Sequence, residues 1–225
     1  MSAVKAVIFD LDGTLADSLD DLADCGNFCL ETFGFLKQRT EDYKYLVGDG
    51  LSKLIERVLP EDSQTPDIIA KIRDTWLDYY SVHCLDKTRP YDNMPDALAV
   101  LKRRGLKLSV VTNKQQELAE KIIGGLYEKN TFDIVCGVKA GVPVKPDPHL
   151  AFAALEFMGV LARETIFVGD TSVDMTCAKN AGCVPVGALW GFRTADELKN
   201  AGAVHLLHSP SELPDIVIPD KSGGS

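Results

Sequence analysis

Short apolar segments rich in β-branched residues alternate along this chain with segments of helical periodicity. The strand candidates cover residues 4–9, 108–111 and 165–168, with weaker ones at 134–135, 184–186 and 204–207. Apolar residues recur at helical spacing at 97–101, 118–123 and 150–158. Because such alternation places helices between parallel strands, it predicts an α/β fold with a doubly wound parallel sheet and helices on both faces.

One long segment interrupts the alternation. Between residues 17 and 87 there is no convincing strand, and three helical patterns follow one another, separated by prolines and a Gly-Asp-Gly turn. We therefore expect a core domain formed by residues 1–16 and 88–225, with an inserted α-helical domain at 17–87.

The charge balance excludes two classes of partner. The 225 residues include 24 Lys or Arg and 33 Asp or Glu, which gives a net charge of −9. A protein that binds nucleic acid or an anionic membrane surface needs a basic face, so we expect neither partner. An anionic small molecule remains compatible, provided that a local site supplies the attraction.

Hydropathy and cysteine content indicate the cellular compartment in which the protein is expected. No segment approaches about 18 consecutive apolar residues, so we expect no membrane span. The first nine residues lack the pattern of a signal peptide. Six cysteines are scattered through a chain that is long enough to fold without disulfides. These features predict a cytoplasmic protein with reduced, buried thiols.

Two carboxylates follow the first predicted strand. Asp10 and Asp12 come directly after the apolar run and precede Gly13 and Thr14. In an open α/β sheet, ligands bind beyond the carboxyl ends of the strands, so both carboxylates are expected at the binding edge. A simple turn is an equal alternative, because Asp, Gly and Thr are common turn residues.

Further polar residues follow later strands. Thr112 and Asn113 end the second strong strand and could bond a phosphate oxygen, although Asn113 would also suit a helix N-cap. Lys145 lies beside a proline, where it could meet a phosphate or carboxylates, or simply be solvated. Asp170 and Asp174 could face one Mg²⁺; alternatively, Asp170 or Thr171 would cap the next helix.

Each of these signals is ambiguous, but together they place four aspartates, a threonine and a lysine on one predicted edge. Four converging carboxylates repel one another unless a cation lies between them. The sequence therefore predicts that a divalent metal and Lys145 share this edge.

These groups also occur in the order of a known family. The chain resembles the haloacid dehalogenase-like superfamily over nearly its whole length. The matching positions are Asp10-x-Asp12-Gly13-Thr14, then Thr112, then Lys145, then Gly169-Asp170-x-x-x-Asp174. The resemblance implies a Rossmann-like core and identifies the inserted helices as a cap domain.

The resemblance also implies a role for each core residue. Asp10 would be the nucleophile that accepts a phosphoryl group, and Asp12 the general acid for the leaving alcohol and then the base for water. Mg²⁺ would be held by the Asp10 carboxylate, the Asp12 main-chain carbonyl and Asp170. Asp174 would support a metal-bound water or Lys145.

The phosphoryl oxygens would be held by Thr112, Asn113 and main-chain amides near Gly13. The physical chemistry agrees with these roles, because a carboxylate attacks a phosphate dianion poorly unless positive charge offsets the repulsion. Mg²⁺ and Lys145 would supply that charge.

The choice within the family depends on two positions. Asp12 is replaced in the family's dehalogenases and phosphonatases, so its presence favours a phosphate ester. The β-phosphoglucomutase-like branch uses a cap histidine where this chain has Leu22, which argues against a mutase. A phosphomutase, a related pyrophosphatase or nucleotide phosphatase, and a non-catalytic binding protein remain as alternatives.

The cap resembles that of phosphoglycolate phosphatases, which makes 2-phosphoglycolate the leading substrate. The matching stretches are 47–51, 54–57, 80–83 and 88–91, with a departure at Asp92-Asn93. A small acidic substrate needs a cation outside the phosphate site. We expect the loop from Gly48 to Gly50, together with Lys53 or Arg57, to contact it; a surface or structural role for Arg57 is an equal alternative. The protein is expected to be a monomer or a homodimer.

Overall fold

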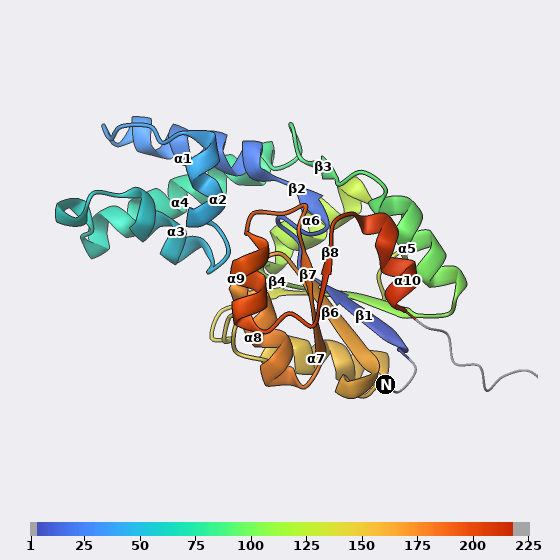
Figure 1. Ribbon diagram of the computed structural model, residues 1–225. Helices are drawn as coiled ribbons and strands as arrows, with labels where there is room; N and C mark the ends of the chain where they lie inside the picture. The colour runs from blue at the N-terminus through green and yellow to red at the C-terminus, as the bar shows by residue number, and fades with distance from the viewer. Residues whose placement is uncertain (1–3, 218–225) are drawn as a thin grey trace, which may run out of the picture.

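A parallel β-sheet of six strands lies at the centre of the residues described by the computed structural model, 4–217 (Figure 1). Its order is β5-β4-β1-β6-β7-β8, and every neighbouring pair is parallel. The strands are β1 (Ala6–Phe9), β4 (Lys107–Gln115), β5 (Ile134–Val138), β6 (Thr165–Gly169), β7 (Val184–Ala188) and β8 (His205–Leu207). Each overlaps a strand predicted from the sequence. Residues 1–3 and 218–225 of the predicted core domain lie outside the described residues.

Helices cover both faces of this sheet, as the alternation predicts. Along β1, Val7 and Phe9 pack into one apolar cluster while Ala6 and Ile8 pack into another. Helices α5 and α6 contribute to the first cluster, and α7 and α8 to the second. The core helices are α5 (Met94–Arg103), α6 (Gln116–Leu126), α7 (His149–Met158), α8 (Ser172–Ala181), α9 (Ala195–Ala201) and α10 (Leu213–Ile216). The doubly wound α/β prediction is therefore confirmed.

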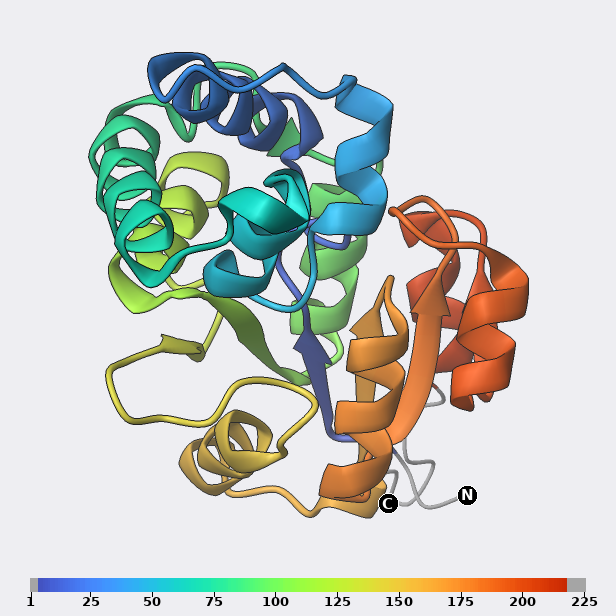
Figure 2. The same ribbon diagram turned by 90° about the vertical axis from the view of Figure 1, so that its left-hand side faces the viewer.

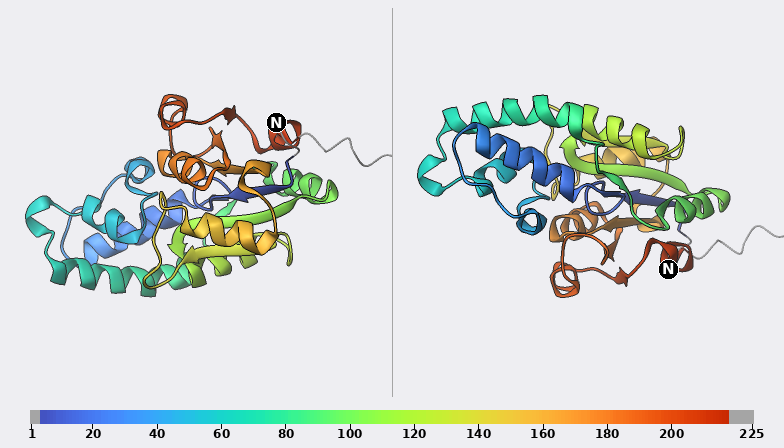
Figure 3. Two further views of the ribbon diagram at one scale, coloured as in Figure 1. Left: turned by 90° about the horizontal axis from the view of Figure 1, so that it is seen from below. Right: turned by 90° about the horizontal axis from the view of Figure 1, so that it is seen from above.

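The segment between β1 and α5 forms a separate group of helices. They are α1 (Leu19–Thr32), α2 (Tyr43–Leu46), α3 (Leu51–Val58) and α4 (Pro66–His83). Figure 3 shows this group at one end of the molecule and the sheet at the other. Tyr43, Ile55, Ile72, Trp76 and Tyr80 are buried within it. We call this helical group the cap.

The two connections between cap and core run side by side. Strand β2 (Ala16–Asp17) pairs antiparallel with β3 (Arg89–Pro90). Beside this pair, the Asp21 carboxylate accepts hydrogen bonds from the main-chain N–H groups of Lys87 and Thr88 and from the Thr88 hydroxyl. The outgoing and returning segments are thus fastened to each other.

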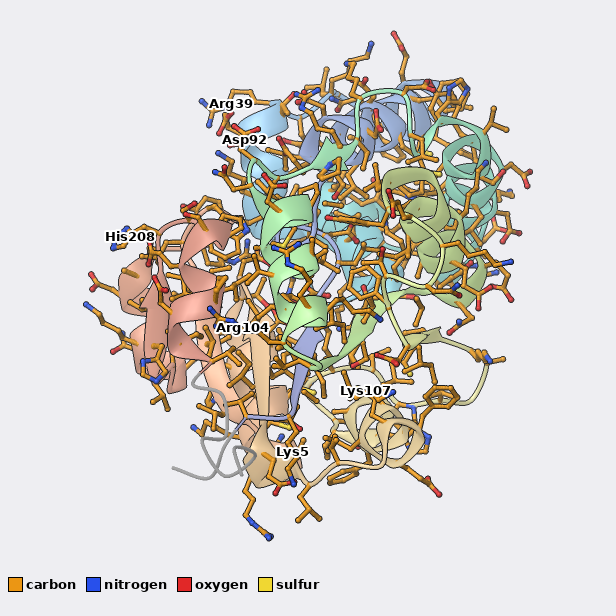
Figure 4. The ribbon with its side chains drawn as sticks, turned by 90° about the vertical axis from the view of Figure 1, so that its right-hand side faces the viewer. Lys5, Arg39, Asp92, Arg104, Lys107 and His208 are labelled. Atoms are coloured by element: carbon orange, nitrogen blue, oxygen red, sulfur yellow. The ribbon has the colours of Figure 1, made fainter. Side chains whose placement is uncertain are left out.

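The carboxyl ends of the strands face the cap. Figure 4 shows Lys5, just before β1, and Lys107, at the start of β4, at the end of the molecule away from Arg39 of the cap. Figure 2 shows the same arrangement from the opposite side, with β1 running toward the cap helices. Residues that follow β1, β4 and β6 therefore meet beneath the cap, as expected for an α/β sheet.

All six cysteines are free and buried, which agrees with the predicted reduced thiols. None of the helices between residues 4 and 217 has the length and apolar character needed to cross a bilayer.

Candidate active site

Three buried aspartates meet at the cap-facing edge of the sheet. Asp10 follows β1, Asp170 follows the adjacent β6, and Asp174 lies in the first turn of α8. One carboxylate oxygen from each lies within 4.8 Å of one from each of the others. Strand pairing brings them together, because β1 and β6 are neighbours and the Asp10 N–H donates to the Val168 carbonyl.

Lys145 lies between two of these carboxylates. Its Nζ is 2.7 Å from Asp10 Oδ1 and 2.7 Å from Asp174 Oδ1, and only 2% of the side chain is exposed. Although burial alone would lower the pKa of Lys145, Asp10 and Asp174 raise it above its ordinary value. Lys145 is therefore a fixed positive charge at the centre of the cluster.

Burial and mutual repulsion act on the acidic groups. Burial, with the nearby charge of Asp174, raises the pKa of Asp10 to about 7 in spite of Lys145. Burial, followed by the charges of Asp174 and Asp10, raises the pKa of Asp170 well above its usual range. Repelling carboxylates therefore share a site with too little positive charge to ionise all of them easily.

The cluster suits a divalent metal. When ionised, the three aspartates carry three negative charges and Lys145 supplies one positive charge, so a divalent cation would complete the balance. Asp10 Oδ1 is buried, and its contact with Lys145 lacks hydrogen-bond geometry. Hard carboxylate oxygens are the ligands that Mg²⁺ prefers, so the donor set fits such an ion.

Asp170 is held in place by its neighbours. The Thr14 hydroxyl donates to Asp170 Oδ1 (2.9 Å), and the Phe192 N–H donates to Oδ2 (2.8 Å). A Cβ on Gly13 would lie 2.3 Å from Asp170 Oδ2, so a glycine is required there. The Gly13 N–H donates to the Ala16 carbonyl, so Gly13 supports the site through its missing side chain.

The sequence left open whether this segment forms the site or a helix cap with Asp170 or Thr171 as the capping residue, and the structure shows that it does both. Thr171 is the N-cap of α8, and Asp174 completes a capping box with it. Asp174 Oδ2 accepts from the Thr171 N–H and hydroxyl while Oδ1 contacts Lys145.

Asn113 does not cap the following helix. Strand β4 continues to Gln115, which is the N-cap of α6. The Asn113 side chain instead accepts from the Lys145 N–H (2.7 Å) and donates to the Lys145 and Gly48 carbonyls (3.1 and 3.0 Å). Its amide thus fixes the Lys145 loop and the cap loop. Thr112, directly before Asn113 on β4, is buried, with 2% exposure.

Asp12 has two polar contacts that no motif in the sequence indicates. The Ser18 hydroxyl donates to Asp12 Oδ1 at 2.7 Å, and Lys114 Nζ lies 3.0 Å from Oδ2. Lys114 Nζ also donates to the hydroxyl of Tyr80 on α4, at 3.2 Å. Only the spacing of Lys114 could have indicated this contact. Lys114 lies two positions after Thr112, and residues two apart on a strand point to the same face.

A cavity of about 380 Å³ lies between this edge and the cap. Its core side is formed by Asp10, Asp12, Thr112, Asn113 and Lys114, among others. Its cap side is formed by residues 47–54 and by Leu22, Arg73, Trp76, Leu77 and Tyr80.

The predicted cap residues divide into two groups. Gly48, Gly50 and Lys53 line the cavity, and Lys53 pairs with Glu56 at 2.6 Å. Arg57 is absent from the lining; it forms an ion pair with Asp49 and donates to the Leu46 carbonyl. Of the two roles expected for Arg57, these contacts match the structural one and not a contact with the substrate.

Comparisons with known proteins agree with this geometry. Residues 7–188 match the model of the haloacid dehalogenase-like hydrolases. A phosphoglycolate phosphatase from Neisseria meningitidis is 36% identical over 216 residues, covering 95% of this chain and 92% of that protein. An N-acetylmuramic acid 6-phosphate phosphatase from Pseudomonas aeruginosa is 29% identical, covering 95% of each. A crystal structure of a predicted phosphoglycolate phosphatase from Haemophilus somnus superimposes with a TM-score of 0.89 at 25% identity, covering 97% of this chain and all of that one.

Proposed function

The chain belongs to the haloacid dehalogenase-like hydrolases and is a phosphatase, and from this premise we propose that it hydrolyses 2-phosphoglycolate with Mg²⁺ through an aspartyl-phosphate. The observation that carries the proposal is the Asp10–Lys145–Asp174 cluster beneath a small cavity that contains a further cation, Lys114. The similarity to proteins named phosphoglycolate phosphatase supports the choice of substrate.

The proposed reaction has two displacements. In the first, an Asp10 carboxylate oxygen forms a bond to phosphorus, the bond from phosphorus to the ester oxygen breaks, and Asp12 donates a proton to the leaving glycolate. In the second, Asp12 takes a proton from water as the water oxygen attacks phosphorus, and Asp10 leaves with inorganic phosphate as the product. Splitting one difficult displacement in two in this way lowers the barrier of each.

Lys145 offsets the charge of the incoming phosphate, and Asp174 holds Lys145 in position. Mg²⁺, bound by the Asp10 carboxylate, the Asp12 main-chain carbonyl and Asp170, would add positive charge beside the phosphoryl oxygens. Thr112, which lines the cavity, is proposed to donate its hydroxyl to the phosphoryl group.

The cap is proposed to be a domain, residues 17–87, that closes over the substrate. Hydrogen bonds join it to the core in the present arrangement: Asn113 to the Gly48 carbonyl, Lys114 to the Tyr80 hydroxyl, and Arg193 Nη2 to the Val47 carbonyl at 2.8 Å. Closure of this kind excludes water other than the attacking molecule.

Leu22 favours hydrolysis over a mutase reaction. Its side chain is buried and lines the cavity beside Asp10 and Asp12. It offers no acid or base at the place where the resemblance puts a mutase histidine.

The test is phosphate release, with Mg²⁺ and with EDTA, from 2-phosphoglycolate, sugar phosphates, N-acetylmuramic acid 6-phosphate, nucleotides and pyrophosphate. We expect metal-dependent activity with a preference for 2-phosphoglycolate. A preference for pyrophosphate or a nucleotide would show that 2-phosphoglycolate is the wrong substrate. Isomerisation of a phosphosugar without phosphate release would show that the enzyme is a mutase and not a hydrolase. Inactivity on the whole panel would point to a binding protein.

A further inference from the structure

Lys114 is the buried cation nearest to the proposed general acid. Its Nζ lies 3.0 Å from Asp12 Oδ2, and 7% of its side chain is exposed. The Tyr80 hydroxyl accepts from it, and its ammonium lies 4.5 Å from the centre of the Tyr80 ring. Strand β4 and helix α4 together therefore place this charge on the cavity wall beside Asp12.

The position of Lys114 indicates which part of a substrate it meets. The general acid must come within hydrogen-bond distance of the ester oxygen. A cation 3.0 Å from that acid, on the wall of the same cavity, is within reach of the group bound to the ester oxygen. In a short ester, this is where a carboxylate one carbon from the ester oxygen would be.

The other cations of the cavity are placed differently. Lys53 is paired with Glu56, and its side chain is 58% exposed. Arg73 contacts Asp74, and its side chain is 48% exposed. Both belong to the cap side of the cavity, and an exposed ion pair contributes little binding free energy. Lys114 is the best-buried of these three cavity cations and the one in contact with Asp12.

We propose that Lys114 determines specificity by binding a substrate carboxylate that lies one carbon from the ester oxygen. This rests on the proposed phosphatase reaction, and it assigns the carboxylate to the core strand β4 and not to Lys53 or Arg57 of the cap. Tyr80 serves as the cap contact that holds the ammonium in place. The substrate class is that of 2-phosphorylated short-chain carboxylates.

The experiment compares 2-phosphoglycolate with 2-hydroxyethyl phosphate, in which a neutral hydroxymethyl group replaces the carboxylate. The measured quantity is the ratio of the two kcat/KM values. Charged hydrogen bonds contribute about 1.5–3 kcal/mol, and each 1.4 kcal/mol is tenfold. Lys114→Met should therefore reduce the ratio by about 10- to 100-fold.

Two variants serve as matched controls. Lys53→Met removes a cavity cation of the same type and should leave the ratio within about threefold of wild type. Lys114→Arg keeps the charge and should retain a clear preference for the carboxylate. The ratio separates recognition from any effect on Asp12, since loss of a contact to Asp12 alone slows both substrates equally.

A second measurement needs no variant. The wild-type enzyme should lose kcat/KM stepwise as the carboxylate is moved to two and three carbons from the ester oxygen, in 3-phosphooxypropionate and 4-phosphooxybutyrate. Equal or faster hydrolysis of the longer esters would overturn the placement, even if Lys114→Met failed to fold.

The outcomes separate this inference from the proposed substrate. If wild type prefers 2-phosphoglycolate but Lys114→Met keeps the ratio, or if Lys53→Met is the variant that loses it, the role of Lys114 is wrong and the substrate stands. An equal loss on both substrates likewise overturns recognition by Lys114. If wild type shows no preference for the carboxylate, both proposals fail.

Discussion

One carboxylate, that of Asp174, joins Lys145 to the start of helix α8. Its Oδ1 lies 2.7 Å from Lys145 Nζ, and its Oδ2 accepts from the Thr171 hydroxyl at 2.7 Å. The lysine that faces the proposed nucleophile is thus positioned by the group that closes the helix N-terminus.

Asp174→Asn should reduce both activity and stability. An amide can accept from Thr171 only if it turns its NH₂ toward the Lys145 ammonium, which is a repulsive contact. We expect kcat to fall at least tenfold and the free energy of unfolding to fall by about 1–3 kcal/mol. Thr171→Ser, which keeps the capping hydroxyl, should remain close to wild type in steady-state assays and thermal melts. Wild-type values for Asp174→Asn would show that the carboxylate is dispensable.

Asp10→Asn should abolish turnover without unfolding the protein. The raised pKa of Asp10, about 7, also predicts a pH effect on stability. Between about pH 4 and 7 the folded metal-free protein holds a proton that the unfolded chain releases, so this group's contribution to stability falls as the pH rises through that window. In EDTA, Asp10→Asn should therefore melt above wild type at pH 8, and the difference should shrink by pH 5.

Thermal melts of the two proteins across this pH range provide the measurement. A constant difference between them would show that Asp10 titrates normally, and normal turnover of Asp10→Asn would exclude the covalent step.

Mg²⁺ should stabilise the folded protein. A ligand present at a hundredfold excess over its Kd adds about 2.7 kcal/mol, which for a chain of this size raises Tm by roughly 5–10 °C. Asp170→Asn should lose most of this shift, whereas Asp92→Asn, a change at an exposed residue (Figure 4), should keep it. An equal shift in Asp170→Asn and wild type would place the metal elsewhere.

Arg193→Met should weaken substrate binding through the cap. Arg193 is 8% exposed, and its Nη2 donates to the Val47 carbonyl of the cap loop. Loss of this charged hydrogen bond favours the open cap, so KM should rise about tenfold while kcat changes little. Arg39→Met, which removes an exposed cap arginine paired with Asp42, is the matched control. Equal KM values for the two variants would show that the hydrogen bond from Arg193 to Val47 does not stabilise the closed cap.

Local patterns were sufficient to predict much of the fold. The three strong strands were identified because each is a short apolar run followed by polar residues, and helices α5, α6 and α7 because their apolar positions repeat. Helix α2, with four residues, is too short to show periodicity and was not predicted. The candidate metal ligands and Lys145 could be identified because each belongs to a compact motif.

The contacts of the site could not be read from the sequence in the same way. The approach of Lys114 to Asp12 depends on the pairing of β4 with β1 and on Tyr80 from a distant helix. Asn113 was expected to bond a phosphate oxygen or to cap a helix; the extension of β4 to Gln115 and the hydrogen bonds of Asn113 to Lys145 and Gly48 have no local signal. For Arg57 the sequence left a substrate contact and a structural role equally open, because its ion pair with Asp49, in the turn at 48–50, is visible only in the structure.

The two connections between cap and core, paired at β2 and β3, allow the cap to change in evolution while the catalytic core stays the same. Cap residues that make no contact with the core can be altered, lengthened or exchanged while β1 and β6, which are followed by Asp10 and Asp170, keep their register. Selection on the inserted helices can then redirect the enzyme to larger or differently charged phosphate esters without rebuilding its chemistry. Relatives of this chain named for phosphoglycolate and for N-acetylmuramic acid 6-phosphate are consistent with that history.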